Sequence, residues 1–113
     1  MKTLWTWSGT FFGHRDRIDL WTFDGRHVGR FYDDEVYGPD GRYLGEIIND
    51  NRLITCMKKK SKHKEVFDPY DKGVGIIPFA SEAGLEMLAG HEDFPSPENL
   101  GKIANTTATI PRF

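Results

Sequence analysis

Residues 20–54 read LWTFDGRHVGRFYDDEVYGPDGRYLGEIINDNRLI and contain one pattern twice. The segment LWTFDG at 20–25 recurs sixteen residues later as VYGPDG at 36–41, and LWTWSG at 4–9 precedes it at the same spacing. The glycines mark the period, because Gly9, Gly25 and Gly41 are followed, four residues later in each case, by Gly13, Gly29 and Gly45. A pattern repeated three times at constant spacing indicates tandem structural units.

Each repeat is predicted to form one β-hairpin. The tripeptides FDG at 23–25 and PDG at 39–41 suit a type I turn closed by a glycine at positive φ, a common three-residue hairpin loop. Flanking Trp, Tyr, Phe, Val and Leu favour half-buried strands. Asp33-Asp34 and Asn49-Asp50-Asn51 are predicted turns into the next repeat. The second glycine of each repeat lies in a predicted strand, where it indicates a bulge or close backbone approach, so we interpret all six glycines as structural.

The repeats define a predicted β domain over residues 1–79, followed by an extension over 80–113. Its units lie near 4–19, 20–35 and 36–52, with a divergent fourth hairpin over 53–79 that includes strands at 65–67 and 74–79. In this last unit Lys58 and Lys62 stand where the others have glycine. In the extension, capping residues predict a short helix from Ser81 to Gly90 and a second from Ser96 to 104, with a strand or tail over 106–113. The predicted fold class is therefore mainly β, with tandem hairpins, a short helical C-terminal region and one packed domain.

The repeated segments LWTWSGTFFG, LWTFDGRHVG and VYGPDGRYLG resemble the small bacterial domain called the 4-fold β-flower. This resemblance covers residues 4–55 and extends weakly to 79. It implies hairpins arranged about a pseudo-fourfold axis, and it supplies no catalytic residues because the family's function is uncharacterised. Similar turn-glycine hairpins occur in MORN-like arrays, and the glycines missing from the fourth unit depart from strict fourfold symmetry.

Composition excludes several broad classes. The chain has 113 residues, enough for one domain, and its 15 basic and 17 acidic side chains carry no global nucleic-acid or membrane signature. Cys56 is the single cysteine, so an internal disulfide cannot form, which favours a reducing compartment. The first ten residues lack the apolar run of a signal peptide, and we expect a cytoplasmic protein.

A lysine-rich run is the most conspicuous polar feature. The run consists of Lys58, Lys59, Lys60, Lys62, His63 and Lys64. Such a run can bind phosphate backbones by counterion release, or it can be a solvated loop that discourages strand pairing between molecules. We favour the solvated loop, because the rest of the chain is acidic and no aromatic residues interrupt the run.

The other candidates for chemistry have simpler structural explanations. His14, Asp16 and Asp33 could form a metal or hydrolytic cluster, but adjacent acids in a turn point in different directions. Asn49-Asp50-Asn51 occupies the same place as the acids of 33–35, which indicates turn residues. Cys56 lacks a neighbouring base and is predicted to be a small core residue. We therefore predict no metal site, no cofactor and no catalytic residues.

The aromatic residues form two sets that are equivalent by repeat. One set is Trp5, Trp21 and Tyr37, and the other is Phe11, His27 and Tyr43. Because neighbours in a strand alternate faces, we expect one set to point inward and the other outward, either as core or as a binding patch.

The leading functional hypothesis is a non-enzymatic β-repeat interaction module, self-associating or bound to a protein partner. A nucleic-acid-binding accessory protein that uses residues 58–64 is the alternative, and a small metal-dependent hydrolase is the third. No membrane partner is expected.

Overall fold

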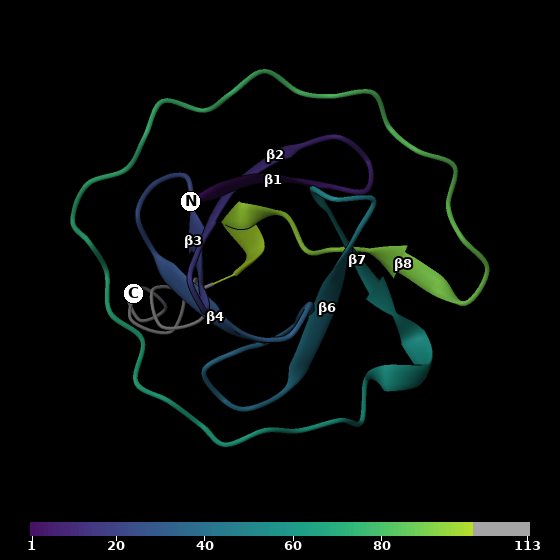
Figure 1. Ribbon diagram of the computed structural model, residues 1–113, viewed down its shortest axis with the longest axis horizontal. Helices are drawn as coiled ribbons and strands as arrows, with labels where there is room; N and C mark the ends of the chain where they lie inside the picture. The colour runs from purple at the N-terminus through teal and green to yellow at the C-terminus, as the bar shows by residue number, and fades with distance from the viewer. Residues whose placement is uncertain (101–113) are drawn as a thin grey trace, which may run out of the picture.

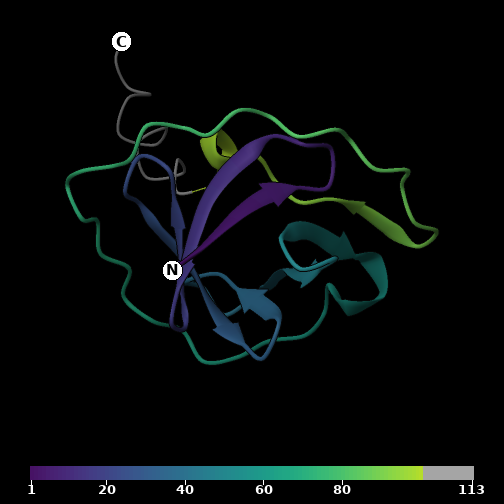
Figure 2. The same ribbon diagram turned by 45° about the horizontal axis from the view of Figure 1, so that its top comes forward.

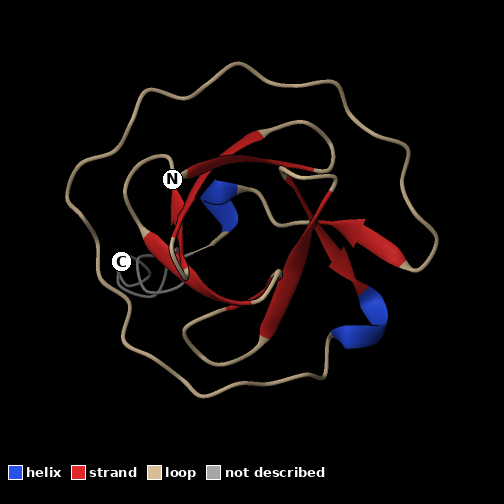
Figure 3. Cartoon of the chain, viewed as in Figure 1, coloured by secondary structure: helices blue, strands red, loops and turns tan. Residues whose placement is uncertain are grey.

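The computed structural model describes residues 1–100 of the chain, which fold into a seven-strand antiparallel barrel closed by one parallel pair (Figures 1 and 3). The barrel strands are β1 (Lys2–Thr6), β2 (Phe11–Asp16), β3 (Asp19–Thr22), β4 (His27–Tyr32), β5 (Glu35–Tyr37), β6 (Tyr43–Ile48) and β7 (Arg52–Cys56). The other elements are the 3-10 turns η1 (Met57–Lys59) and η2 (Pro97–Asn99) and the short strand β8 (His91–Asp93). The predicted mainly β class is confirmed.

The three predicted hairpins form with the predicted turns. In the second hairpin the amide of Gly25 donates to the carbonyl of Thr22 at 3.0 Å, and Gly25 has a φ of +86°. The equivalent bonds join Gly9 to Thr6 and Gly41 to Gly38. Each hairpin also has one register shift at the same place, directly after Leu4, Leu20 or Val36. Local sequence therefore decides these units.

The barrel closes where β1 meets β7 in parallel, with Trp5 paired to Arg52 and Thr6 to Leu53. Its interior holds a single apolar cluster contributed by every repeat. The buried members are Leu4, Phe12, Leu20, Val28, Phe31, Val36, Leu53 and Phe94. Leu4, Leu20 and Val36 occupy one position of the repeat, so the sixteen-residue period builds the core.

The fourth hairpin differs from the prediction. The expected strands at 65–67 and 74–79 do not form, and β7 pairs instead with β8, with Cys56 opposite His91. Residues 57–90 are therefore the connection within this strand pair. After β8 the chain enters the barrel, where Phe94 is 2% exposed and contacts the Phe12 ring edge-on at a centroid distance of 5.4 Å.

Most of that connection is an irregular extended segment, residues 60–90, which we call the strap. It runs around the outside of the barrel as the teal-to-green ring in Figure 1 and follows the same outer course in Figure 2. The predicted helix from Ser81 to Gly90 is wrong, because those residues are extended and irregular. The second predicted helix is present only as the turn η2, and its continuation to 104 and the strand or tail at 106–113 lie outside the described residues.

The strap is held by the main chain of each hairpin turn in succession. Lys72 and Ile76 donate their amides to the carbonyls of Gly25 and Phe23, at 2.9 and 2.7 Å. The same pair of bonds joins Lys64 and Phe67 to the third turn and Glu82 and Leu85 to the first. A Cβ atom at Gly9, Gly25 or Gly41 would lie closer than 3.0 Å to a strap carbonyl oxygen. The turn glycines thus serve the hairpin and the strap together.

Candidate functional site

The two repeat-equivalent aromatic sets are buried together, and not on opposite faces as expected. Trp5 is paired across the hairpin with Phe11, Trp21 with His27, and Tyr37 with Tyr43. Directly opposed residues on antiparallel strands share a face. The expectation of opposite faces considered neighbours along one strand. These six residues are instead partners across the two strands of each hairpin. All six are at most 7% exposed.

Side chains of the strap cover these pairs. Phe79 stacks on Phe11 at a centroid distance of 5.0 Å, and the Trp5 indole N–H donates to the Ala80 carbonyl at 2.9 Å. In the second repeat Tyr70 lies 5.0 Å from the Trp21 ring and 4.9 Å from the His27 ring. In the third, the Lys64 ammonium lies 5.7 Å from the centre of the Tyr37 ring. The repeat aromatics therefore form an outer core beneath the strap.

The strap exposes many apolar side chains. Ile77 is 86% exposed, Val74 71% and Val66 70%. Tyr70, Phe79, Leu85, Met87 and Leu88 are also exposed. Among the described residues, only Met1, Ile18 and Met57 share this property elsewhere. The strap thus concentrates exposed apolar side chains, of which Tyr70 and Phe79 also contact the aromatic pairs beneath them.

Three of the five lysines in the run form ion pairs with acids on β5, β6 and β8. The Lys59 ammonium lies 2.9 Å from the Glu35 carboxylate and 2.7 Å from that of Glu46. Lys62 also binds Glu35, at 3.0 Å, and Lys60 binds Glu92, at 2.6 Å. The hydrogen bond from Lys59 is the main reason that the pKa of Glu35 falls to about 2. The run therefore anchors the start of the strap.

These contacts reduce what the run can offer to a phosphate backbone. Lys58, Lys60, Lys62 and Lys64 remain exposed, but Lys60 and Lys62 share their charge with a carboxylate. The His63 ring nitrogen Nδ1 lies 2.8 Å from the Ser61 carbonyl, and the main chain of His63 bridges to Arg42. Binding of nucleic acid would have to compete with these internal partners.

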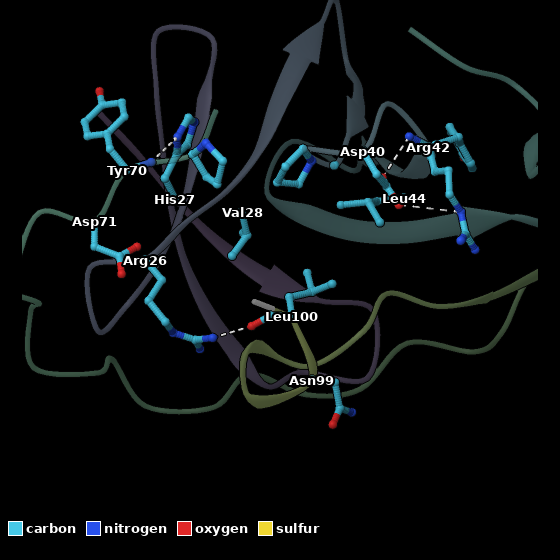
Figure 4. A pocket seen from close by; sticks show the side chains of 14 residues that line it. Arg26, His27, Val28, Asp40, Arg42, Leu44, Tyr70, Asp71, Asn99 and Leu100 are labelled. Carbon is cyan, nitrogen blue, oxygen red and sulfur yellow. Dashed lines mark hydrogen bonds and ion pairs between the residues drawn. The ribbon is translucent and has the colours of Figure 1, made fainter. Parts of the chain in front are cut away.

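A pocket of about 650 Å³ opens between the second and third hairpins, beneath strap residues 69–71. Figure 4 shows Arg26, His27 and Tyr70 on one side, Asp40, Arg42 and Leu44 on the other, and Leu100 between them. Val28, Leu44 and Leu100 supply apolar wall. The Arg42 side chain is 71% exposed and only loosely paired with Asp40, at 3.9 Å.

Of the other ionisable groups that line this pocket, His27 and Arg26 already have partners among the described residues. His27 Nε2 lies 2.9 Å from the Asp19 carboxylate, and its Nδ1 accepts the Tyr70 amide at 3.3 Å. The Arg26 guanidinium pairs with Asp24 and donates to the carbonyls of Pro97 and Leu100. Such an arrangement can bind a ligand, and the carboxyl groups of Asp40 and Asp71 also line it.

The weaker candidate, a metal or hydrolytic cluster of His14, Asp16 and Asp33, is not assembled. His14 is buried on β2, Asp16 ends that strand, and Asp33 begins the β4–β5 turn at a φ of +57°. Within residues 1–100, these three side chains do not form a group of converging metal donors. Burial lowers the pKa of His14, whose ring nitrogens have no hydrogen-bond partner among the described residues. Sequence reasoning also missed the pocket, because its walls come from segments far apart in the chain.

Comparison of the chain with protein-family models, with curated proteins and with solved structures found no match. The site must therefore be interpreted from its own geometry. None of the helices among residues 1–100 is long and apolar enough to cross a membrane.

Proposed function

We propose that this protein is a non-enzymatic interaction module that self-associates through the outer face of its strap. The observation that carries the proposal is the concentration of exposed apolar side chains on residues 66–88, with Ile77 the most exposed of them. Exposed apolar side chains that lie close together, such as Val74 and Ile77, can form part of an interaction patch. The strap is held against the barrel by the buried aromatic pairs, on which Phe79 and Tyr70 pack.

Charge favours a second copy of this chain as the occupant. Residues 58–64 contain five lysines, whereas residues 65–90 contain five acids and one lysine. In a twofold pair, an exposed lysine such as Lys58 of each copy can meet the acidic segment of the other, because such an interface is self-complementary. The net charge of −2 imposes little repulsion between copies.

The test is the molar mass of the purified full chain by light scattering across a range of concentrations. The wild type is expected to form a dimer or larger assembly, and Ile77→Asp to shift the equilibrium toward monomer. Ile18→Asp is the matched control, because Ile18 is 52% exposed but lies in the β2–β3 turn. A wild type that stays monomeric, or equal effects of the two variants, would refute the proposal.

The same samples distinguish the nucleic-acid alternative. Mixed RNA and DNA are titrated at low and moderate salt, because backbone binding weakens steeply as salt rises. The alternative would replace the proposal on two results together. The wild type would have to stay monomeric, and it would have to bind nucleic acid in a salt-sensitive way that Lys58→Glu abolishes.

The pocket favours a second candidate function, the binding of a small ligand with an apolar body and an anionic group. Its volume lies within the range of small-molecule sites, and the Arg42 guanidinium is available to an anion. The probe is anilinonaphthalene sulfonate, whose fluorescence rises in apolar surroundings. Arg42→Ala should weaken its binding severalfold, and Arg17→Ala, in the exposed β2–β3 turn, should not. Equal binding by both variants would exclude the pocket.

Two further parts of the proposal rest on sequence. The glycine-marked repeats support kinship with the 4-fold β-flower. A cytoplasmic location rests on the single cysteine.

A further inference from the structure

Three side chains with metal-binding donors meet on neighbouring strands, outside the surfaces described above. They are Glu46 on β6, Cys56 at the end of β7 and His91 at the start of β8. One donor atom of each lies within 4.8 Å of the donor atoms of the other two. Sequence reasoning treated Cys56 as a core residue and overlooked this grouping, because His91 is separated from Cys56 by the strap.

Strand pairing explains why the three groups converge. Cys56 and His91 are directly opposed residues of β7 and β8. Glu46 is paired with Ile54, which is two residues before Cys56 on the same strand. Opposed residues share a face, and residues two apart in a strand share a face, so all three side chains leave the same side of the sheet.

We propose that Glu46, Cys56 and His91 form a zinc-binding site. A thiolate, an imidazole and a carboxylate are all established zinc ligands, whereas magnesium and calcium prefer oxygen alone. Tetrahedral zinc with bonds of roughly 2.0–2.3 Å places its ligand atoms roughly 3.3–3.8 Å apart. Donors within 4.8 Å of one another need only small side-chain rotations to reach that geometry. Three protein ligands leave the fourth position for water.

The His91 ring is already oriented for this role. Its Nδ1 lies 2.8 Å from the Ala89 carbonyl oxygen, which can only accept, so Nδ1 carries the proton. The neutral ring then has its lone pair on Nε2, the atom available to a metal. Metal-binding histidines are commonly held in this way by a hydrogen bond from the other ring nitrogen to a carbonyl or carboxylate.

The other two ligands are also held in place. Glu46 is 9% exposed, and its Oε1 accepts from the Lys59 ammonium at 2.7 Å, which leaves Oε2 for the ion. The Cys56 amide donates to the Tyr43 hydroxyl at 3.0 Å. Binding would release one proton from the Cys56 thiol to solvent, so that the ion would meet a thiolate and a carboxylate.

The experiment titrates the reduced full chain with Co²⁺, a spectroscopic substitute for zinc. Because Cys56 is the only cysteine, a thiolate-to-cobalt charge-transfer band in the near ultraviolet reports on this residue alone. Residues 101–113 contain no Cys, His, Asp or Glu that could supply another ligand. The wild type is expected to develop the band with one equivalent of Co²⁺ and to lose it when Zn²⁺ is added.

Variants separate ligation from general effects on the fold. Cys56→Ser should abolish the band, and His91→Gln should weaken Co²⁺ binding roughly tenfold or more. His63→Gln is the matched control, because His63 makes the same contact with the carbonyl two residues before it, also at 2.8 Å, yet lies outside the cluster. Far-ultraviolet circular dichroism checks that each variant is folded. If Cys56→Ser does not fold, the Co²⁺ affinity of His91→Gln decides the test. Absence of the band in the wild type, or equal affinity in His91→Gln and the wild type, would overturn the proposal.

Discussion

The role of the turn glycines can be tested by comparing Gly25→Ala with Gly73→Ala. Both glycines have similar positive φ, +86° and +81°, so an added side chain costs each about 1–2 kcal/mol of backbone strain. They differ in their surroundings. A Cβ at Gly25 would lie closer than 3.0 Å to the Val74 carbonyl oxygen, whereas a Cβ at Gly73 would meet nothing within 4 Å.

The extra cost at Gly25 follows from the bonds that the displaced strap would lose. Lys72 and Ile76 donate to the second turn at 2.9 and 2.7 Å, and each such bond contributes about 1 kcal/mol. Gly25→Ala should therefore lower the free energy of unfolding by about 2 kcal/mol more than Gly73→Ala. With a denaturant slope of ~2 kcal/mol/M, the difference between the variants is ~1 M in the urea midpoint.

Hydrogen exchange locates the effect on the strap. In Gly25→Ala the amides of Lys72 and Ile76 should exchange roughly thirtyfold faster than in the wild type, which is the rate equivalent of about 2 kcal/mol. The Lys64 amide, which donates to Gly41 at the third turn, should change little and serves as the internal control. Equal urea midpoints for the two variants, or unchanged exchange at the second turn, would show that the strap does not depend on this glycine.

Three further perturbations test the ion pairs and the core. Because the folded-state pKa of Glu35 is about 2 and its ordinary value 4.5, its pairing with Lys59 stabilises the protein above pH 4.5, and this stability is lost as the pH falls through about 2. In urea unfolding across pH 2–7, the free energy of unfolding of Glu35→Gln should lack about 1–2 kcal/mol of this pH dependence. The figure is reduced because the Glu35 side chain is 21% exposed. A plot of that free energy against pH parallel to that of the wild type would contradict the pairing. Phe94→Ala should cost about 3–5 kcal/mol in the same assay, since the ring is 2% exposed inside the barrel, and a loss below about 1 kcal/mol would place it outside the core. Arg52→Met should cost about 2–3 kcal/mol, because the buried guanidinium donates to the carbonyls of Trp7 and Ala83 at 3.1 and 2.7 Å; no loss of stability would mean that water replaces it.

Sequence alone determined the three hairpins and their turns. Asp24 and Gly25, or Asp40 and Gly41, specify a tight turn through interactions within a few residues, and the flanking large side chains favour strands. Local rules were sufficient there because each turn bond joins residues three apart, as between Gly25 and Thr22. They failed for residues 81–90, where cap-like residues at both ends suggested a helix.

Only the tertiary structure decided the closure of the barrel, the course of the strap and the assembly of the candidate sites. The segment from Ser81 to Gly90 is extended because its main chain bonds to the first hairpin turn, with Glu82 donating to Gly9, and such partners cannot be recognised from propensity. Glu46, Cys56 and His91 meet for the same reason. The pairing of β6 with β7 follows a predicted tight turn, but His91 reaches its place opposite Cys56 only after the strap has passed around the barrel.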